Sequence, residues 1–429
     1  MNAVFLFLVA GAVLVGLATG RWDALTSAML DAARSAVDVA LGLVGAMALF
    51  LGVVEVVRRA GLMDALARAV RPVFRLLFPD VPAGHPALGM MTLNIAANML
   101  GLGNAATPFG VEAMRQLDRL NGDKGTATDA MCLFLAINTS GVSLLATGVV
   151  ALRHSLGSRD PAGILVTSFL ATSLSTAAAI AAALALARLP PFRRSRPRPA
   201  ADPSPAPPEP PPEAAGRKRF RPARAAAALL FALALAAAAV RGGLLAANEQ
   251  GTGPALRGLL SQALLPLLVT AGLLYGWSRG VDVYAALTEG AKEGFRIAVM
   301  IIPYLVAILV AVGMFRASGA LDAIVAWLAP LTRPLGFPAE ALPMALVRPL
   351  SGSGALGVMT EIMKTHGPDS FIGYLVSTIN GSTETTFYVL AVYGGAVGLK
   401  RARHALPACL VGDLFGVIGA TAACHLFFG

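Results

Sequence analysis

Long apolar segments recur along the chain and limit its fold more than any other feature. They fill residues 2–19, 37–57, 127–151, 161–187, 292–314 and 405–428. Each is near or above the roughly 18–20 residues that an α-helix needs to cross about 30 Å of hydrocarbon. Only 14% of the residues are charged, against about 25% in soluble domains. The sequence therefore predicts an all-α polytopic membrane protein, and we expect residues 2–19 to be a retained first span.

A basic, proline-rich segment divides the chain into two halves. Residues 190–212 hold eleven prolines, a composition that favours extended chain over a packed core. Residues 188–224 carry ten Arg and Lys against three acids, a net charge of +7. Such an excess is typical of cytoplasmic loops, and no nucleic-acid-binding motif accompanies it, so we expect no nucleic-acid partner. The predicted units are two halves, 1–188 and 224–429, joined by a cytoplasmic linker, 189–223.

The two halves share an ordered series of glycine, proline, acidic and asparagine residues. The matched pairs are Gly61 with Gly319, Asp64 with Asp322, Pro72 with Pro330, Pro86 with Pro343, Glu112 with Glu361, and Ile137-Asn138-Thr139-Ser140 with Ile379-Asn380-Gly381-Ser382. Chance similarity between apolar segments would not keep this order. The series therefore predicts an internal repeat.

Loop charges indicate that the two repeats are inverted. With the linker in the cytoplasm, the arginines of residues 58–75 fall on the same side if residues 86–114 dip into the membrane without crossing it. The second half has an extra span before its repeat, so the basic residues 400–404 reach the cytoplasm only if residues 341–364 also dip. We expect two inverted-topology repeats, each with a re-entrant helical hairpin and discontinuous helices, and about nine full spans plus two hairpins.

Polar residues gather in the first predicted hairpin. The candidates for substrate binding there are Asn94, Asn98, Asn104 and Thr107. Asn94 and Asn98 share one helix face, and the glycines that follow break the helix before Thr107-Pro108 can start another. A helix N-terminus at the tip would offer free N–H groups to an anion or a polar ligand. The alternative is that the Asn side chains only satisfy the backbone of the tip.

The equivalent position of the second half holds Arg348, Ser351 and Ser353. The neighbouring glycines allow a tight break whose backbone amides would hold an anion. An arginine at membrane depth is costly unless it is paired or hydrated, so Arg348 is expected to pair with an acid or to bind a carboxylate or phosphate. The candidate partners are Glu361, Glu384 and Asp413. The other interpretation is an interfacial arginine at the mouth of the hairpin.

The duplicated Ile-Asn-x-Ser phrase puts amides and hydroxyls into apolar segments. The candidate binding residues are Asn138, Thr139 and Ser140 in the first copy and Asn380, Ser382, Thr383 and Glu384 in the second. The adjoining glycines weaken the helix, and freed carbonyls with side-chain oxygens suit sodium or an uncharged polar solute. The alternative is hydrogen bonding between helices. Glu384 is the first candidate for ion or proton coupling, followed by Glu361 and Asp413.

No metal site, cofactor or enzymatic activity is expected. The three cysteines and five histidines are scattered without the spacing of metal ligands. The chain has no phosphate-binding loop, so direct coupling to ATP is not expected. A catalytic triad is not recognisable in the sequence either. Membrane lipids and a small-molecule or lipid substrate are the expected partners, and the small-residue helix faces would also allow a homo-oligomer.

Several strings resemble known families. The first half, with Asn-Ile-Ala-Ala-Asn-Met-Leu-Gly-Leu-Gly-Asn-Ala-Ala-Thr-Pro-Phe-Gly and Ile-Asn-Thr-Ser, resembles the spore maturation protein A family. The second half, with Arg-Pro-Leu-Ser-Gly-Ser-Gly-Ala and Ser-Thr-Glu-Thr-Thr-Phe-Tyr, resembles the spore maturation protein B family. Both are membrane proteins with nucleoside-recognition, or gate, domains. The resemblance implies a bacterial inner-membrane protein with two cooperating domains and distant kinship with concentrative nucleoside transporters.

These features predict a secondary transporter or flippase-like translocator. Its substrate, polar or amphipathic, would bind near the membrane midplane between the two repeats. One alternative is a non-transporting sensor or scaffold for the cell envelope or for spore maturation. A membrane enzyme acting on lipid or cell-wall precursors is a third interpretation, for which no nucleophile is evident.

Overall fold

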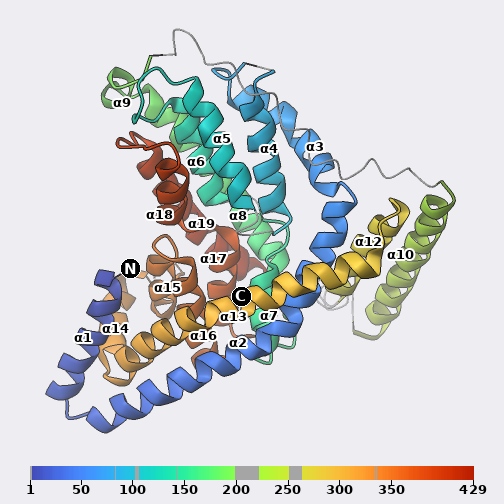
Figure 1. The fold of residues 1–429 in the computed structure, drawn as a ribbon. Helices are drawn as coiled ribbons and strands as arrows, with labels where there is room; N and C mark the ends of the chain where they lie inside the picture. The colour runs from blue at the N-terminus through green and yellow to red at the C-terminus, as the bar shows by residue number, and fades with distance from the viewer. Residues whose placement is uncertain are drawn as a thin grey trace.

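Helices make up nearly all of the backbone in the computed structural model (Figure 1). The structure describes residues 2–82, 84–101, 106–141, 143–198, 222–250, 263–332, 334 and 336–429. Within these ranges, β-type pairing is limited to one isolated bridge between Thr126 and Arg401. The predicted all-α fold is therefore confirmed.

The helices of the two halves follow one another in a similar order. The first half contains α1 (Asn2–Ala18), α2 (Trp22–Arg59), α3 (Leu62–Leu77), α4 (Pro86–Met99), α5 (Thr107–Arg119), α6 (Asp129–Ser140), α7 (Thr147–Ser155) and α8 (Ile164–Arg188), and the short α9 (Pro190–Arg194) follows in the predicted linker. The second contains α10 (Pro222–Gln250), α12 (Leu264–Ser278), α13 (Val283–Ala317), α14 (Ala320–Thr332), η4 (Ala339–Ala341), α15 (Leu342–Val347), α16 (Gly352–His366), α17 (Phe371–Ser382), α18 (Thr386–Val389), a π-helical turn η5 (Leu390–Gly394) and α19 (Ala405–Phe428).

Several helices have the length and composition of membrane spans. Among the described residues these are Trp22–Arg59, Ile164–Arg188, Arg224–Gly242 and Ala405–Phe428. The two parts of α13 meet at a bend of 42° and, counted together, would be a fifth membrane span. Pro303 lies at that bend. A proline inside a helix removes one backbone hydrogen bond, which explains the bend. The chain is a multi-pass membrane protein, while the predicted number of spans stays a prediction.

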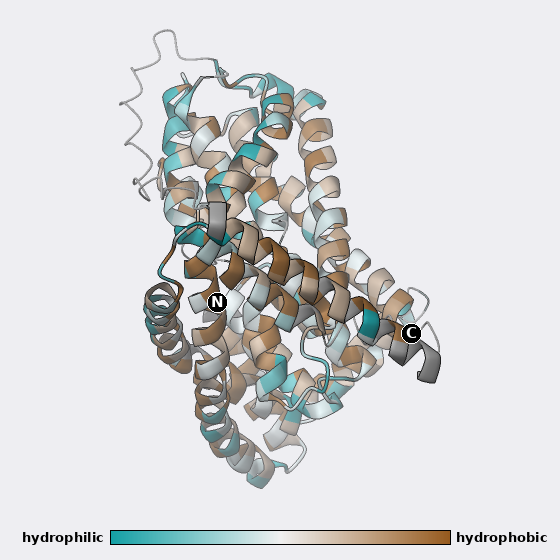
Figure 2. Ribbon diagram, turned by 90° about the vertical axis from the view of Figure 1, so that its right-hand side faces the viewer, coloured by the Kyte–Doolittle hydropathy of each residue, from teal (hydrophilic) through white to brown (hydrophobic). Residues whose placement is uncertain are grey.

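The outer surface of the long helices is apolar. Leu41 on α2, Trp327 on α14 and Leu414 on α19 are more than half exposed. In Figure 2, brown (hydrophobic) dominates the long helices, and teal (hydrophilic) gathers in the connections between them. Large exposed apolar side chains on so many helices fit a surface that faces lipid tails rather than water.

Two close helix pairs join the halves. The long helices α2 and α13 lie side by side (Figure 1), and a Cβ built on Gly294 would lie only 2.6 Å from the Cα of Ala48. The last helices of the halves, α8 and α19, also pack together, with a Cβ on Gly419 only 3.1 Å from the Cα of Ala171. Small residues let backbones approach this closely, which is a common way of joining helices in membranes.

Each half contains one helix that is broken near its middle. In the first half α6 ends at Ser140 and α7 begins at Thr147, and in the second half α17 ends at Ser382 and α18 begins at Thr386. Both α6 and α17 begin with a hydroxyl cap, because Thr128 and Ser370 each accept a hydrogen bond from a backbone N–H three residues on. Each Ile-Asn-x-Ser phrase is therefore the C-terminal end of a broken helix.

Two arginine–aspartate pairs, which we call the clamps, tie the halves together at opposite ends of α8. In one clamp the buried Arg153, at the end of α7, pairs with Asp369 at 3.0 Å and donates to the carbonyl of Pro368. In the other, Arg403 pairs with Asp129 at 2.6 Å and donates to the carbonyl of Phe192. In each clamp, the aspartate lies at the start of a broken helix in one half. The arginine lies in the segment before the last helix of the other half.

Histidine 404, next to the second clamp, carries no charge at neutral pH. Burial, helped by the neighbouring Arg403 guanidinium, lowers the pKa of His404 to about 4. His404 therefore adds no positive charge to this clamp. The clamps and the close helix pairs hold the two halves together. The division of the chain at residues 189–223 stays a prediction, and residues 199–221 lie outside the described residues.

Candidate functional site

A polar pocket of about 810 Å³, which we call the central pocket, lies where the two broken helices meet. Its walls come from the end of α4, the two helix breaks, the start of α16 and one residue of α13. The two breaks are joined directly, because the backbone N–H of Glu384 donates to the carbonyl of Thr139 at 2.7 Å. Thr139 and Glu384 are 245 residues apart in the chain, so distant segments form one site.

Arg348 links the second hairpin to the second break. Its guanidinium donates to the carbonyl of Thr383 and, at 3.4 Å, to the hydroxyl of Thr385. It also lies 3.7 Å from the Glu384 carboxylate. Of the three acids considered for Arg348, Glu384 is thus the one that pairs with it. The Arg348 side chain is 9% exposed and that of Glu384 is 50% exposed, so the carboxylate faces the pocket more openly than its partner.

The start of α16 faces the central pocket beside Arg348. Ser351 caps this helix by accepting a hydrogen bond from the N–H of Gly354 at 3.0 Å, and Ser353 lines the pocket. The first N–H groups of a helix have no partner within it, and the helix dipole adds partial positive charge there. Arg348 and the start of α16 therefore make one side of the pocket suited to an anionic group.

Amide side chains also line the central pocket. Asn98 at the end of α4 lines the pocket and donates to the side-chain oxygen of Asn138 at 3.2 Å. Asn138 in turn donates to the carbonyl of Phe134, which fixes the direction of its amide. Asn380 lines the pocket from α17. The hairpin of the first half thus contacts the first break as the hairpin of the second half contacts the second.

The structure brings seven of the predicted binding residues to the wall of the central pocket. They are Asn98, Arg348, Ser351, Ser353, Asn380, Thr383 and Glu384. Asn138 and Thr139 lie directly behind this wall through the bonds described above. The assignment of these side chains to substrate binding stays a prediction.

The other predicted residues that the structure describes lie away from the pocket wall. Asn94 donates to the carbonyl of Ala106 and to the hydroxyl of Tyr393, which matches the alternative of an asparagine that satisfies the hairpin tip. Ser140 and Ser382 donate back to carbonyls of their own helices. Thr107 begins α5, and Asn104 lies outside the described residues.

The further coupling candidates differ in their surroundings. Asp413 accepts a hydrogen bond from Thr386 at 2.7 Å, just behind the second break. Glu361 lies near the far end of α16 and pairs with Arg316 at 3.1 Å, so it belongs to a different part of the molecule from the central pocket. Among the described residues, no group of three or more His, Cys, Asp or Glu is arranged to hold a metal ion.

The structure adds pocket residues that the sequence reasoning did not select. They are Ser143, Thr147, Thr385, Phe387 and Tyr388. The polar three follow the duplicated phrases closely, so their spacing was a usable signal. Phe387 and Tyr388 are 42% and 47% exposed, and nothing in the sequence distinguishes an aromatic side chain in a pocket from one that faces lipid.

Comparison with known proteins places these elements in a family. The model for nucleoside recognition, named Gate, matches residues 40–156 and 298–400, two segments that each contain a hairpin and a break. The chain is 50% identical to spore maturation protein B of Bacillus subtilis over 170 residues, which cover 40% of this chain and 96% of that protein. It is 37% identical to spore maturation protein A of the same organism over 180 residues, 42% of this chain and 92% of that protein.

No solved structure matches the chain. The resemblance found in the sequence is nevertheless confirmed, because the family model covers about half of the chain and the chain covers nearly the whole of both relatives. The chain therefore belongs to the nucleoside-recognition, or Gate, family of membrane proteins and is related to both spore maturation proteins A and B.

Proposed function

We propose that this protein is a secondary transporter or flippase-like translocator of the bacterial inner membrane, with its substrate in the central pocket. The observation that carries the proposal is the bond between Glu384 and Thr139, which joins two broken helices at one polar pocket. Broken helices whose ends face a shared site are a recurrent design of secondary transporters. No enzymatic step is part of the proposal.

The site lies between two inverted repeats. The order of the helices supports this arrangement: each half has a long helix, a hairpin, a broken helix and a final span. The first and last of these helices pair across the halves, α2 with α13 and α8 with α19. The clamps support inversion, because equivalent contacts lie at opposite ends of α8, a helix roughly 37 Å long at a rise of 1.5 Å per residue.

The end of the molecule that carries Arg403 faces the cytoplasm. Residues 188–198 meet the basic residues 400–403 there, since Arg403 donates to the carbonyl of Phe192. Lys400 and Arg401 bond through their backbones to Gly125, which follows Lys124. This concentration of positive charge at one end supports a cytoplasmic linker.

The substrate combines hydrogen-bonding groups with a flat or apolar part. Asn98 and Asn380 offer amides, Ser353 offers a hydroxyl, and Phe387 and Tyr388 offer exposed aromatic surface. A nucleoside has this chemistry, and the family model is named for nucleoside recognition. Arg348 and the start of α16 would hold an anionic group of a larger amphipathic substrate. Nucleosides are therefore the first probes to use.

Transport by the purified full-length chain in proteoliposomes tests this function. We expect radiolabelled uridine or adenosine to accumulate under an imposed sodium or proton gradient. Glu384→Gln should abolish gradient-driven uptake, since it removes the carboxylate of the central pocket, and Asn380→Ala should reduce uptake at least about tenfold by removing a substrate hydrogen bond. Glu289→Gln, on an exposed face of α13, should transport like the unmodified chain.

A folded Glu384→Gln variant with full gradient-driven uptake would contradict the site assignment. A second candidate function is a sensor or scaffold that binds the same ligand without moving it. The names of both relatives describe maturation of the spore rather than transport, which favours this candidate. Saturable nucleoside binding by the purified chain, with no flux under any gradient, would establish it in place of the transporter.

A further inference from the structure

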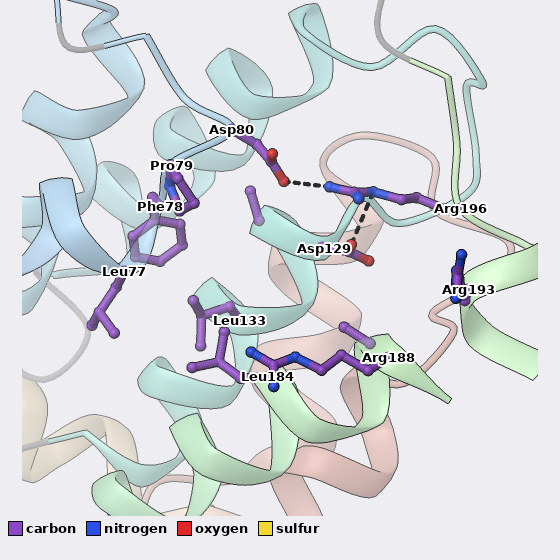
Figure 3. A pocket seen from close by; sticks show the side chains of 12 residues that line it. Leu77, Phe78, Pro79, Asp80, Asp129, Leu133, Leu184, Arg188, Arg193 and Arg196 are labelled. Carbon is purple, nitrogen blue, oxygen red and sulfur yellow. Dashed lines mark hydrogen bonds and ion pairs between the residues drawn. The ribbon is translucent and has the colours of Figure 1, made fainter. Parts of the chain in front are cut away.

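Figure 3 shows a second pocket, of about 520 Å³. One of its lining residues is Asp129, which belongs to the Arg403 clamp. We call this pocket the arginine pocket. It is formed by the end of α3, the start of α6, the end of α8 and the short α9. Its apolar lining consists of Leu77, Phe78, Pro79, Ala130, Leu133, Leu184 and Ala187. Its charged lining consists of Asp80, Asp129, Arg188, Arg193 and Arg196.

The three arginines of this pocket are not equally occupied. Arg196 pairs with Asp80 at 2.7 Å and with Asp129 at 3.0 Å, as the dashed lines in Figure 3 show. Within the described part of the chain, no acidic side chain pairs with Arg188 or Arg193. Two guanidinium groups beside one apolar surface are thus left without an anion.

The arginine pocket lies where an apolar helix surface gives way to charge. The apolar span α8 ends at Arg188, and Leu184 one turn earlier is 41% exposed. Farther along the same helix, Phe169, Leu170 and Leu174 are also exposed. In a spanning helix, the first charges after the apolar run lie at the level of the lipid headgroups. Acyl chains would therefore lie along α8 and phosphates beside Arg188.

We propose that the arginine pocket binds the phosphate of an anionic membrane phospholipid, with an acyl chain along the exposed apolar face of α8. Guanidinium groups bind phosphate through two parallel hydrogen bonds, and anionic headgroups are attracted to basic sites between helices. The apolar lining favours a lipid over a free phosphate, because a small hydrophilic anion would leave Leu133 and Leu184 in contact with water. This inference does not depend on the proposed transport function.

The position of the arginine pocket gives the lipid a structural role. Asp129 is the first residue of α6, and it pairs both with Arg196 of this pocket and with Arg403 of the clamp. A phosphate held by Arg188 and Arg193 would lie in the same pocket as the Asp129 carboxylate. A bound anionic lipid is thereby linked through one side chain to the start of a helix whose other end forms the central pocket.

Native mass spectrometry of the full-length chain tests the proposal. The delipidated protein is offered phosphatidylglycerol and phosphatidylcholine with identical acyl chains at equal concentration. We expect phosphatidylglycerol to be retained about tenfold over phosphatidylcholine. Arg188→Gln/Arg193→Gln should remove most of this preference, whereas Arg188→Lys/Arg193→Lys should keep part of it through charge alone.

A matched control removes the same charge elsewhere. Arg68→Gln/Arg71→Gln changes two exposed arginines of α3 outside the pocket and should keep the full preference for phosphatidylglycerol. An equal loss in this control would show that bulk charge, not the pocket, selects the lipid, and would overturn the proposal. So would an unchanged preference in Arg188→Gln/Arg193→Gln. Displacement of the lipid by glycerol 3-phosphate at the same concentration would assign the pocket to a soluble phosphate instead.

Discussion

Arg348 stabilises the conformation of the second break. It is almost fully buried and donates to the carbonyl of Thr383 and the hydroxyl of Thr385, two groups that the break leaves without helical partners. Among the described residues, the Nε of Arg348 has no hydrogen-bond partner. A buried guanidinium with one unused donor at the edge of a pocket is energetically costly, and a ligand anion or its hydration would lower that cost.

Gly101 allows the first hairpin to approach the first break closely. Its φ is +70°, and a Cβ at this position would lie 2.4 Å from the carbonyl oxygen of Leu145. Gly157 has a similar φ of +81° but open space around its Cα. The two glycines therefore separate the cost of the backbone conformation from the cost of the contact.

We predict that Gly101→Ala destabilises the protein clearly more than Gly157→Ala. Both changes force an L-residue into the left-handed region, at about 1 kcal/mol, and only Gly101→Ala also displaces the break that lines the central pocket. The measurement is the apparent melting temperature of each purified variant in the same detergent. Equal melting temperatures for the two variants would mean that the hairpin and the break are not in the contact described.

Single residues show how far sequence reasoning reached. Their polarity within apolar segments selected Asn98, Arg348, Asn380 and Glu384 as candidate binding residues. A polar or charged group in hydrocarbon is costly unless it has a partner. The same reasoning selected Asn94, whose amide N–H groups donate to Ala106 and to Tyr393 rather than facing the central pocket. Polarity in hydrocarbon shows that a side chain needs a partner, but only the three-dimensional arrangement shows whether the partner is the protein or a ligand.

Among the helices, the pairing of α2 with α13 depends on glycine. Cβ atoms on Gly290 and Gly294 would lie within 2.4 to 2.6 Å of backbone atoms of α2. No side chain can move aside to relieve these contacts, because the neighbours are backbone atoms. This pair is therefore a rigid contact between the first long helices of the two halves.

We predict that Gly294→Val separates α2 from α13 and lowers stability by about 2 kcal/mol, as overpacking does in other tightly packed interiors. Gly45→Val, on α2 itself, meets nothing within 4 Å and is the control for the change in helix propensity. Thermal unfolding of both variants in detergent measures the difference. A Gly294→Val variant as stable as Gly45→Val would contradict the close approach.

For the molecule as a whole, the proposed inverted arrangement predicts which ends face which side of the membrane. Arg159 adjoins the Arg153 clamp and Lys400 adjoins the Arg403 clamp, so single cysteines at these positions should be accessible from opposite sides. In intact cells with a permeabilised outer membrane, an impermeant maleimide should label Arg159→Cys. It should label Lys400→Cys only after the inner membrane is opened.

The native cysteines give a low background for this labelling, because Cys132, Cys409 and Cys424 are all buried. Labelling of both introduced cysteines from the same side would contradict the inverted repeats. Labelling of Lys400→Cys alone in intact cells would keep the repeats but reverse their orientation, which would place the linker outside the cytoplasm.

The large-scale fold was predictable from sequence to the extent that hydrophobicity determines it. Apolar segments predicted the helices. The equivalence of the two halves as repeats, which the order of Gly, Pro and Asn predicts, stays a prediction. The clamps were not predicted, although Arg153-His154 and Arg403-His404 form a further duplicated pair. Each arginine lies near a helix end, where a charged residue needs no partner. Its pairing with an aspartate of the other half could therefore be seen only in the packed structure.

The two clamps carry a consequence for how the polypeptide is assembled. Each one joins a residue of the first half to a residue of the second, at opposite ends of α8. Halves that hold each other at both ends need no covalent link to find their relative position. We infer that the single chain fixes stoichiometry: one copy of each half is made for every copy of the other, while the contacts between the halves supply the recognition.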